Sequence, residues 1–192
     1  MRSQSQLSIL VMLSFLLLSA NAASATDIER RKGLGYAQGV GGVSGLALNY
    51  GLGSLGLEAI VGMSRFSYAD GGPEPRLTFG TALGAHFHLL SSQNAALTVG
   101  GRINLATGTA NANGTAVEVT QIGFDLPLRV YWFPTRHISI HSEFGLAVMM
   151  GSEDALLISA QDGDSTLEAG GLAIIAFRQS APMGQLGLTY WW

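Results

Sequence analysis

The side chains that could do chemistry lie at alternate positions of otherwise apolar segments. His86 and His88 close one such segment, and His137 and His141 open another. Alternate residues of a strand point to one side, so each histidine pair could offer two imidazoles to a divalent metal. Because two further strands would separate the pairs, we predict neither a metal site nor a cofactor.

Carboxylates and guanidiniums recur at the same parity as the histidines. On the inner face of a narrow barrel they would fill the interior with ion pairs, because charges removed from water must be paired. The predicted lumen cluster comprises Glu58, His86, His88, Arg102, Asp125, Arg129, His137, His141 and Glu143, with Asn104, Tyr131 and Ser139 at the same parity.

The segments that carry these residues have the two-residue period of β-strands. Between residues 121 and 133, apolar side chains such as Phe124 and Leu126 alternate with Asp125 and Arg129. A secreted β-sandwich also alternates, but its exposed face would be rich in Lys and Glu instead of Gly, Ala, Thr and His. The pattern favours an all-β, transmembrane, antiparallel up-and-down β-barrel. We predict eight strands, near residues 33–40, 43–50, 55–66, 76–90, 96–108, 116–133, 137–151 and 184–192.

The connections between these strands alternate in length, as they do in outer-membrane barrels. Short periplasmic turns are predicted at 51–54, 91–95 and 134–136, and longer outer loops at 67–75, 109–115 and 152–183. Two places fit less well. The first hairpin, near Gly41 and Gly42, is very tight, and residues 167–177 could extend strands beyond the membrane or form an additional strand.

Composition supports a membrane environment. The chain is 47% hydrophobic and 12% charged, whereas charged residues make up about a quarter of an ordinary soluble domain. Its net charge is -3, with scattered basic residues, so we predict no nucleic-acid partner. It contains no cysteine, which excludes disulfides, thiol catalysis and a lipid-modified cysteine.

The N-terminal segment predicts export. Arg2 precedes an apolar run from about Leu7 to Leu18, and small residues follow, which is the order of a secretory signal peptide. We predict a signal peptide at 1–25, cleaved after Ala22 or Ala25, a short periplasmic lead-in at 26–32, and a barrel at 33–192. The predicted location is the cell outer membrane, reached through the periplasm.

The last strand carries a family signature. Leu186, Leu188, Tyr190 and Trp192 alternate to the end of the chain, and this run resembles the β-signal by which outer-membrane proteins are recognised for insertion, with Trp where that pattern more often has Phe. Over nearly its full mature length the chain resembles the small OmpA/OmpX-type outer-membrane barrels, most clearly at Gly33–Tyr36 and Phe124–Trp132. The resemblance implies contact with outer-membrane lipid and with the barrel-insertion machinery.

The pair formed by His137 and Ser139, with Glu143 nearby, superficially resembles the His-x-Ser pair of outer-membrane lipid A deacylases. A serine nucleophile needs a base within hydrogen-bond reach and a third group that orients it. Their alternate positions on the strand predict that these side chains point into the lumen, whereas a lipid substrate approaches from outside the barrel. We therefore predict no catalysis and keep a lipid A-modifying enzyme as the third alternative.

The function predicted from sequence is that of a monomeric outer-membrane barrel with a structural or loop-mediated role. Side chains would fill its lumen, because an eight-stranded barrel is just wide enough for them. An extracellular ligand would bind loop 152–183. The main alternative is a narrow pore or small-solute channel.

Overall fold

The structure is a computed structural model that describes residues 30–66, 76–112, 115–152, 157, 166–169, 172–176 and 185–192. The predicted signal peptide at 1–25, the first four residues of the predicted lead-in at 26–32, and the predicted loop at 67–75 lie outside the described residues. Within the described part of the chain, no helix is both long enough and apolar enough to cross a membrane.

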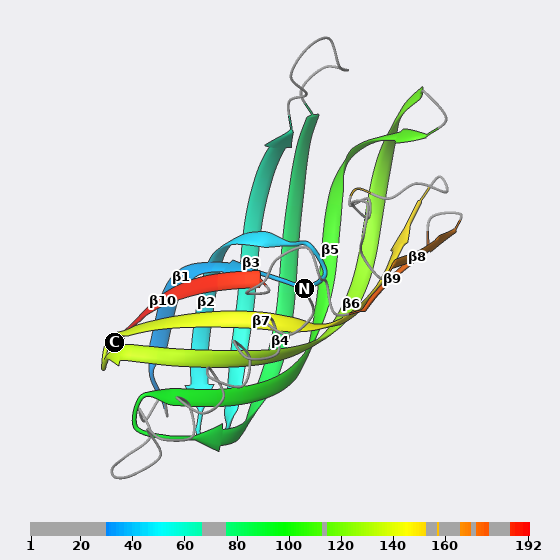
Figure 1. Ribbon diagram of the computed structural model, residues 1–192. Coiled ribbons are helices and arrows are strands. Elements are labelled where there is room, and N and C mark those ends of the chain that lie inside the picture. The colour runs from blue at the N-terminus through cyan, green and yellow to red at the C-terminus, as the bar shows by residue number, and fades with distance from the viewer. Residues whose placement is uncertain are drawn as a thin grey trace, which may run out of the picture.

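The described residues form ten β-strands of one antiparallel sheet (Figure 1). Their bounds are β1 Lys32–Gln38, β2 Ser44–Leu52, β3 Leu55–Phe66, β4 Arg76–Ser91, β5 Ala95–Ala112, β6 Thr115–Thr135, β7 Ile138–Gly151, β8 Thr166–Ala169, β9 Leu172–Ala176 and β10 Gln185–Trp191. All eight strands predicted from sequence are present at nearly the predicted positions.

Eight of these strands close into a barrel. β1 to β7 pair in chain order, and β10 pairs with β1 on one side and with β7 on the other. Closure leaves no free backbone edge along the paired part of the wall, which a barrel in lipid requires. The predicted eight-stranded antiparallel barrel is confirmed.

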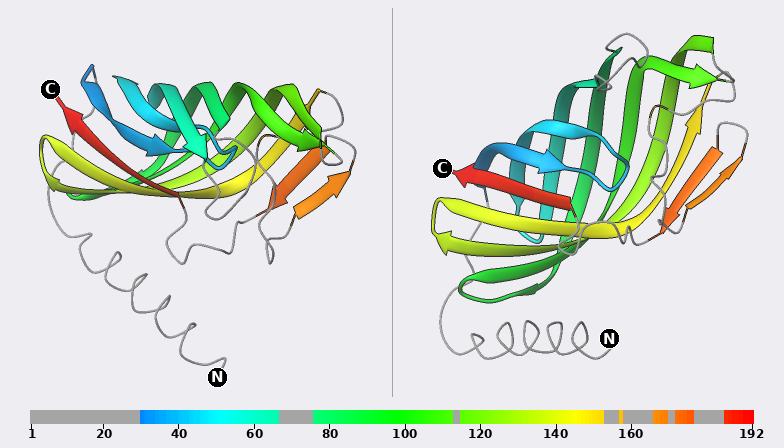
Figure 2. Two further views of the ribbon diagram at one scale, coloured as in Figure 1. Left: turned by 90° about the horizontal axis from the view of Figure 1, so that it is seen from above. Right: turned by 45° about the horizontal axis from the view of Figure 1, so that its top comes forward.

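Within the range 167–177, whose structure the sequence left open, the described residues extend the wall instead of closing it. β9 pairs with the C-terminal half of β7, from Leu146 to Met150, and β8 pairs with β9. β10 pairs with the N-terminal half of β7, from Ile138 to Glu143. β7 therefore exchanges one neighbour for another along its length, and β8 and β9 lie at the end of the barrel opposite the chain's C-terminus (Figure 2).

The wall has unequal height. β1 and β10 have 7 residues each and β2 has 9, whereas β5 has 18 and β6 has 21. β4, β5 and β6 accordingly rise beyond the β1–β2 hairpin in Figure 1. The end with the compact turns near Gly53, Asn94 and Arg136 is called the short-turn end below, and the other end the long-loop end.

Side chains alternate between the two faces of the wall. Large apolar residues point outward on every barrel strand, among them Tyr36, Leu48, Val61, Leu83, Ile103, Phe124, Val148 and Leu188. The inward positions hold glycine, alanine, several larger apolar side chains such as Ile60 and Met149, and the polar and aromatic residues described next. This inverts the arrangement of a soluble sandwich, whose aliphatic side chains are buried.

Candidate functional site

The centre of the barrel holds five buried charged side chains from four strands. Glu58 lies on β3, Arg102 on β5, Asp125 and Arg129 on β6, and Glu143 on β7. The strand register places Arg102 opposite Asp125 and Arg129 opposite Glu143. Glu58 reaches both arginines from the β3 side of the wall. We call these five residues the ionic core.

Arg102 contacts all three carboxylates of the ionic core. Its Nη1 lies 3.0 Å from Glu58 Oε2, and its Nη2 lies 2.6 Å from Asp125 Oδ2. Nη2 also donates to Glu143 Oε1. A planar guanidinium presents five N–H donors in a fixed fork, which suits it to bridging several carboxylates at once.

Arg129 joins two of the same carboxylates from the short-turn side. Its Nη2 lies 2.8 Å from Glu58 Oε2 and 2.6 Å from Glu143 Oε2. Its Nη1 donates to the Tyr131 hydroxyl at 2.7 Å. The two arginines and three carboxylates thus form one connected network across the lumen.

The network has more carboxylates than guanidiniums, and backbone amides donate to the additional negative charge. The N–H of Val40 donates to Glu143 Oε1 at 2.9 Å, and the N–H of Gly41 donates to Asp125 Oδ2 at 3.0 Å. Both amides belong to the β1–β2 connection. Hydrogen bonds to ionised acceptors are stronger than neutral ones, so the loop and the ionic core stabilise each other.

The β1–β2 connection, residues 39–43, turns into the barrel and closes it. Val40 is 1% exposed, and Gly39 donates its N–H to the Val43 carbonyl at 2.9 Å. A Cβ on Gly39 would lie 2.6 Å from Arg102 Nη2, and one on Gly41 would lie 2.5 Å from Asn104 Nδ2. A larger residue at either position would have to displace these side chains, because the loop backbone packs directly on them. The sequence prediction of a very tight hairpin missed this inward fold.

A second closure lies further toward the long-loop end. The Leu157 N–H donates to Gln121 Oε1 at 3.0 Å, and Leu157 packs with Val117 against buried Val119. The Gln121 side-chain amide also contacts Met149 Sδ at 3.2 Å. Leu157 belongs to the predicted loop 152–183, so that loop reaches the interior wall at this residue.

The short-turn end is closed by aromatic side chains. Tyr131, Phe133 and Trp191 are buried together with Ala96, and the rings of Tyr131 and Phe133 stack with centroids 5.8 Å apart. The Trp191 indole N–H donates to Ser139 Oγ at 2.8 Å. These inward aromatics form an apolar floor beneath the ionic core.

The four histidines do not all lie in the lumen. His86 and His141 are buried, and His88 is half-buried and lines a small cavity with His86, Asn49, Tyr131 and Trp191. His137 is exposed, so its placement in the lumen cluster was wrong. β7 begins one residue later, at Ile138, and the His137 ring stacks on outward Tyr190 with centroids 5.9 Å apart. No group of three or more His, Asp or Glu suited to a metal occurs among the residues that the structure describes.

Several buried polar side chains were missed from sequence. Asn49, Thr98 and Thr189 each face the interior, and both Asn49 side-chain atoms, the Thr98 hydroxyl and the Thr189 hydroxyl make no hydrogen bond within the described protein. Both ring nitrogens of His141 are also buried and make no hydrogen bond within the described protein. Their inward parity was visible in the sequence, but short neutral side chains gave no reason to single them out.

The geometry at His137 and Ser139 does not form a catalytic pair. Ser139 Oγ accepts the Trp191 indole N–H, while His137 Nδ1 lies 2.9 Å from the Trp191 carbonyl oxygen. The two side chains lie on opposite sides of the wall, one buried and one exposed. A histidine in this position has no access to the serine proton.

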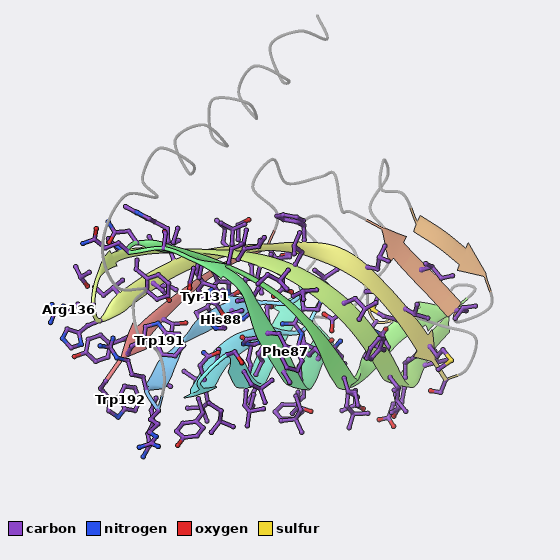
Figure 3. The ribbon with its side chains drawn as sticks, turned by 90° about the horizontal axis from the view of Figure 1, so that it is seen from below. Phe87, His88, Tyr131, Arg136, Trp191 and Trp192 are labelled. Carbon is purple, nitrogen blue, oxygen red and sulfur yellow. The ribbon has the colours of Figure 1, made fainter. Side chains whose placement is uncertain are left out.

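The residues of the predicted insertion signal all point outward. Leu186, Leu188, Tyr190 and Trp192 are between 44% and 55% exposed. Trp191 lies between the last two and points inward, as the alternation requires. Trp191 and Trp192 lie at the same end of the barrel as Arg136 in Figure 3.

No family model and no curated protein matches the sequence. Among solved structures, the chain is similar to the N-terminal β-barrel domain of Pseudomonas aeruginosa OprF, with 10% identity, a TM-score of 0.49, and coverage of 85% of this chain and 98% of that one. It is also similar to Neisserial surface protein A (12%, TM-score 0.45, 83% and 92%) and to Ail, the attachment invasion locus protein of Yersinia pestis (8%, TM-score 0.44, 85% and 99%). The assignment of the fold rests on the strand pairings of the chain itself.

Proposed function

We propose that this chain is an integral outer-membrane protein whose closed barrel anchors an interacting surface at the long-loop end, without catalysis. The observation that carries the proposal is the outward apolar belt. Large hydrophobic side chains on all eight barrel strands are exposed, with Leu83 at 68% and Ile103 at 62%. Soluble monomers rarely expose contiguous apolar areas of this extent, whereas lipid covers them in an outer-membrane barrel.

The orientation in the membrane follows from the connections. Outer-membrane barrels have short periplasmic turns and longer outer loops, so we assign the short-turn end to the periplasm. Outward Tyr50, Trp132, Tyr190 and Trp192 belong to this end, which suits the preference of Trp and Tyr for the membrane–water interface.

A closed interior favours an anchor over a pore. Four groups fill the lumen in order from the short-turn end to the long-loop end. They are the aromatic floor, the ionic core, the inward β1–β2 loop and Leu157. An ion on this path would have to displace buried, mutually bonded charges. We therefore place the interaction of this protein outside the lumen, in loop 152–183, with an extracellular ligand.

The exposed face of β10 is the proposed contact for the barrel-insertion machinery. Leu186, Leu188, Tyr190 and Trp192 present one continuous outward row. Because β10 completes the barrel by pairing with both β1 and β7, we propose that the inserted protein is a monomer.

Insertion and conductance test the anchor. We expect the purified protein to enter phospholipid vesicles, to resist protease over residues 33–66 and 76–151, and to migrate faster in gel electrophoresis before heating than after it. In planar bilayers we expect no steady single-channel currents. Complete digestion in vesicles would contradict membrane integration, and steady currents would contradict the closed interior.

A deletion tests the loop. Removing residues 158–165 leaves Leu157, β8 and β9 in the chain, and heat-dependent migration reports whether the barrel still forms. We expect a folded barrel that no longer binds the cells or matrix components that the intact protein binds. Unchanged binding by the folded deletion variant would contradict the assignment of the interaction to this loop.

A further inference from the structure

We propose that the short-turn rim binds the phosphate headgroups of anionic phospholipids through a basic cluster formed by Arg30, Arg31, Lys32 and Arg136. The inference rests on the proposed membrane insertion and adds a lipid class to it. These residues comprise four of the ten Lys and Arg residues of the chain. We call them the basic rim.

Strand pairing brings the two parts of the basic rim together, although Arg31 and Arg136 lie 105 residues apart in sequence. Lys32 and Trp192 exchange backbone hydrogen bonds of 3.1 and 3.0 Å, and Trp191 donates its N–H to the His137 carbonyl at 2.7 Å. The end of β10 therefore lies between the start of β1 and the β6–β7 turn. Arg136, in that turn, and Trp192 are seen at one end of the barrel in Figure 3.

A side-chain hydrogen bond joins the two parts of the basic rim. Arg31 Nη1 donates to the Arg136 carbonyl oxygen at 2.7 Å. Backbone bonds also hold the basic segment against β2, since Arg30 donates to the Gly51 carbonyl at 2.9 Å and Gly51 donates to the Arg31 carbonyl at 3.0 Å. The segment is thereby ordered as part of the rim, with Arg30, Lys32 and Arg136 exposed.

No aspartate or glutamate side chain among the described residues lies at the rim. Glu58, Asp125 and Glu143 are buried in the ionic core, and Glu118 and Glu168 lie on the outer parts of β6 and β8. A cluster of basic side chains at a membrane surface attracts anionic lipid electrostatically. A guanidinium also matches a phosphate with two parallel hydrogen bonds.

The neighbouring aromatics place the basic rim at headgroup depth. Trp192 and Tyr190 are 55% and 54% exposed, their rings stack with centroids 6.3 Å apart, and His137 stacks on Tyr190. Such rings settle at the interface between acyl chains and headgroups. The outward apolar belt begins beside them at Ile138 and Ile140, so a lipid can contact the belt with its chains and the basic rim with its phosphate.

The test compares lipid selectivity in vesicles. The full protein, purified from membranes and inserted into vesicles, is probed with spin-labelled phosphatidylglycerol and spin-labelled phosphatidylcholine, and the fraction of each label immobilised at the protein is measured. We expect the wild-type barrel to prefer phosphatidylglycerol, and high salt to weaken this preference because it screens exposed charges. The double variant Arg31→Gln/Arg136→Gln should lose the preference, and Arg31→Lys/Arg136→Lys should retain most of it.

A control removes the same charge at the other end. Arg65→Gln/Arg76→Gln lies on the outer parts of β3 and β4 and should keep the wild-type selectivity. Equal selectivity in wild type and the Arg31/Arg136 glutamine variant, or equal loss in the Arg65/Arg76 control, overturns the lipid site while the barrel remains inserted. Failure of the wild-type protein to insert into any vesicle would instead overturn the proposed function itself.

Discussion

The backbone N–H of Gly41 donates to Asp125 Oδ2 at 3.0 Å, joining the first hairpin of the barrel to a strand 84 residues further along the chain. A loop that could have extended into solvent is thereby held inside the lumen. Its amide dipoles point at the carboxylates of an ionic core that has more negative than positive side chains. The interior is therefore closed by backbone amides of the β1–β2 loop as well as by side chains.

The first prediction concerns the space at this loop. Gly41→Ala would place a Cβ 2.5 Å from Asn104 Nδ2, which donates to Asp125 Oδ1 at 3.0 Å and cannot move without losing that bond. We expect a loss of about 1–3 kcal/mol in the free energy of unfolding, the usual cost of overpacking a filled interior. Denaturant titration in detergent micelles measures it.

The matched control for Gly41→Ala is Gly101→Ala. A Cβ at Gly101 would meet the Phe124 ring at 3.6 Å, an ordinary contact. The free energy of unfolding of the Gly101→Ala variant should stay close to that of the wild type. Equal losses at the two positions would show that the inward loop has no special requirement for glycine.

The second prediction concerns the ionic core. Arg129→Met removes a guanidinium that lies 2.8 Å from Glu58 and 2.6 Å from Glu143. Removing one partner from a buried charge network costs about 3–5 kcal/mol, because the remaining charges are left uncompensated. In the double variant Glu58→Met/Arg129→Met, the loss should be smaller than the sum of the two single losses, as measured by a double-mutant cycle. Additive losses would mean that these two side chains act independently.

The third prediction has the opposite sign. Thr98 lies directly opposite Arg129 in the β5–β6 register, yet its buried hydroxyl makes no hydrogen bond within the described protein. Thr98→Val keeps the shape and removes a polar atom without a partner. Since an unmade buried hydrogen bond costs about 1–3 kcal/mol, we expect unchanged or increased stability in the same titration. A clear loss would reveal that the hydroxyl is bonded in the membrane.

The fourth prediction concerns the aromatic floor. Ser139→Ala leaves the buried Trp191 indole N–H without its acceptor, 2.8 Å away in the wild type. We expect a loss of about 1–3 kcal/mol, together with a shift of the tryptophan emission maximum.

Trp191→Phe provides the partner variant for this test. Ser139→Ala made in the Trp191→Phe background should cost less than it does alone, because no indole N–H remains to be satisfied. Equal costs in both backgrounds would assign the role of Ser139 to a different contact.

The alternating residues of the wall were predictable because the period of a β-strand is fixed, so each residue's parity determines its face. Glu58, Arg102, Asp125, Arg129, His141 and Glu143 are buried, and Leu186, Leu188, Tyr190 and Trp192 are exposed. Parity holds only within a strand. His137 was misplaced because it precedes β7, where the β6–β7 register shifts between Trp132 and Thr135.

The inward loop was not predictable in the same way. Residues 39–43 carry no charged side chain, and what holds them is a pair of amides meeting carboxylates from β6 and β7. Such contacts depend on the closed barrel and leave no local pattern. The run of glycines was visible, but it signals a close backbone approach only once the approaching side chains are known.

β7 pairs with β10 from Ile138 to Glu143 and with β9 from Leu146 to Met150. The bonds that seal the cylinder are therefore separate from those that dock the β8–β9 hairpin. Foreign peptides grafted between Gly151 and Gln185 would leave the sealing bonds intact. The same separation would allow the sequence of this segment to change while the membrane-spanning wall keeps its strand pairings.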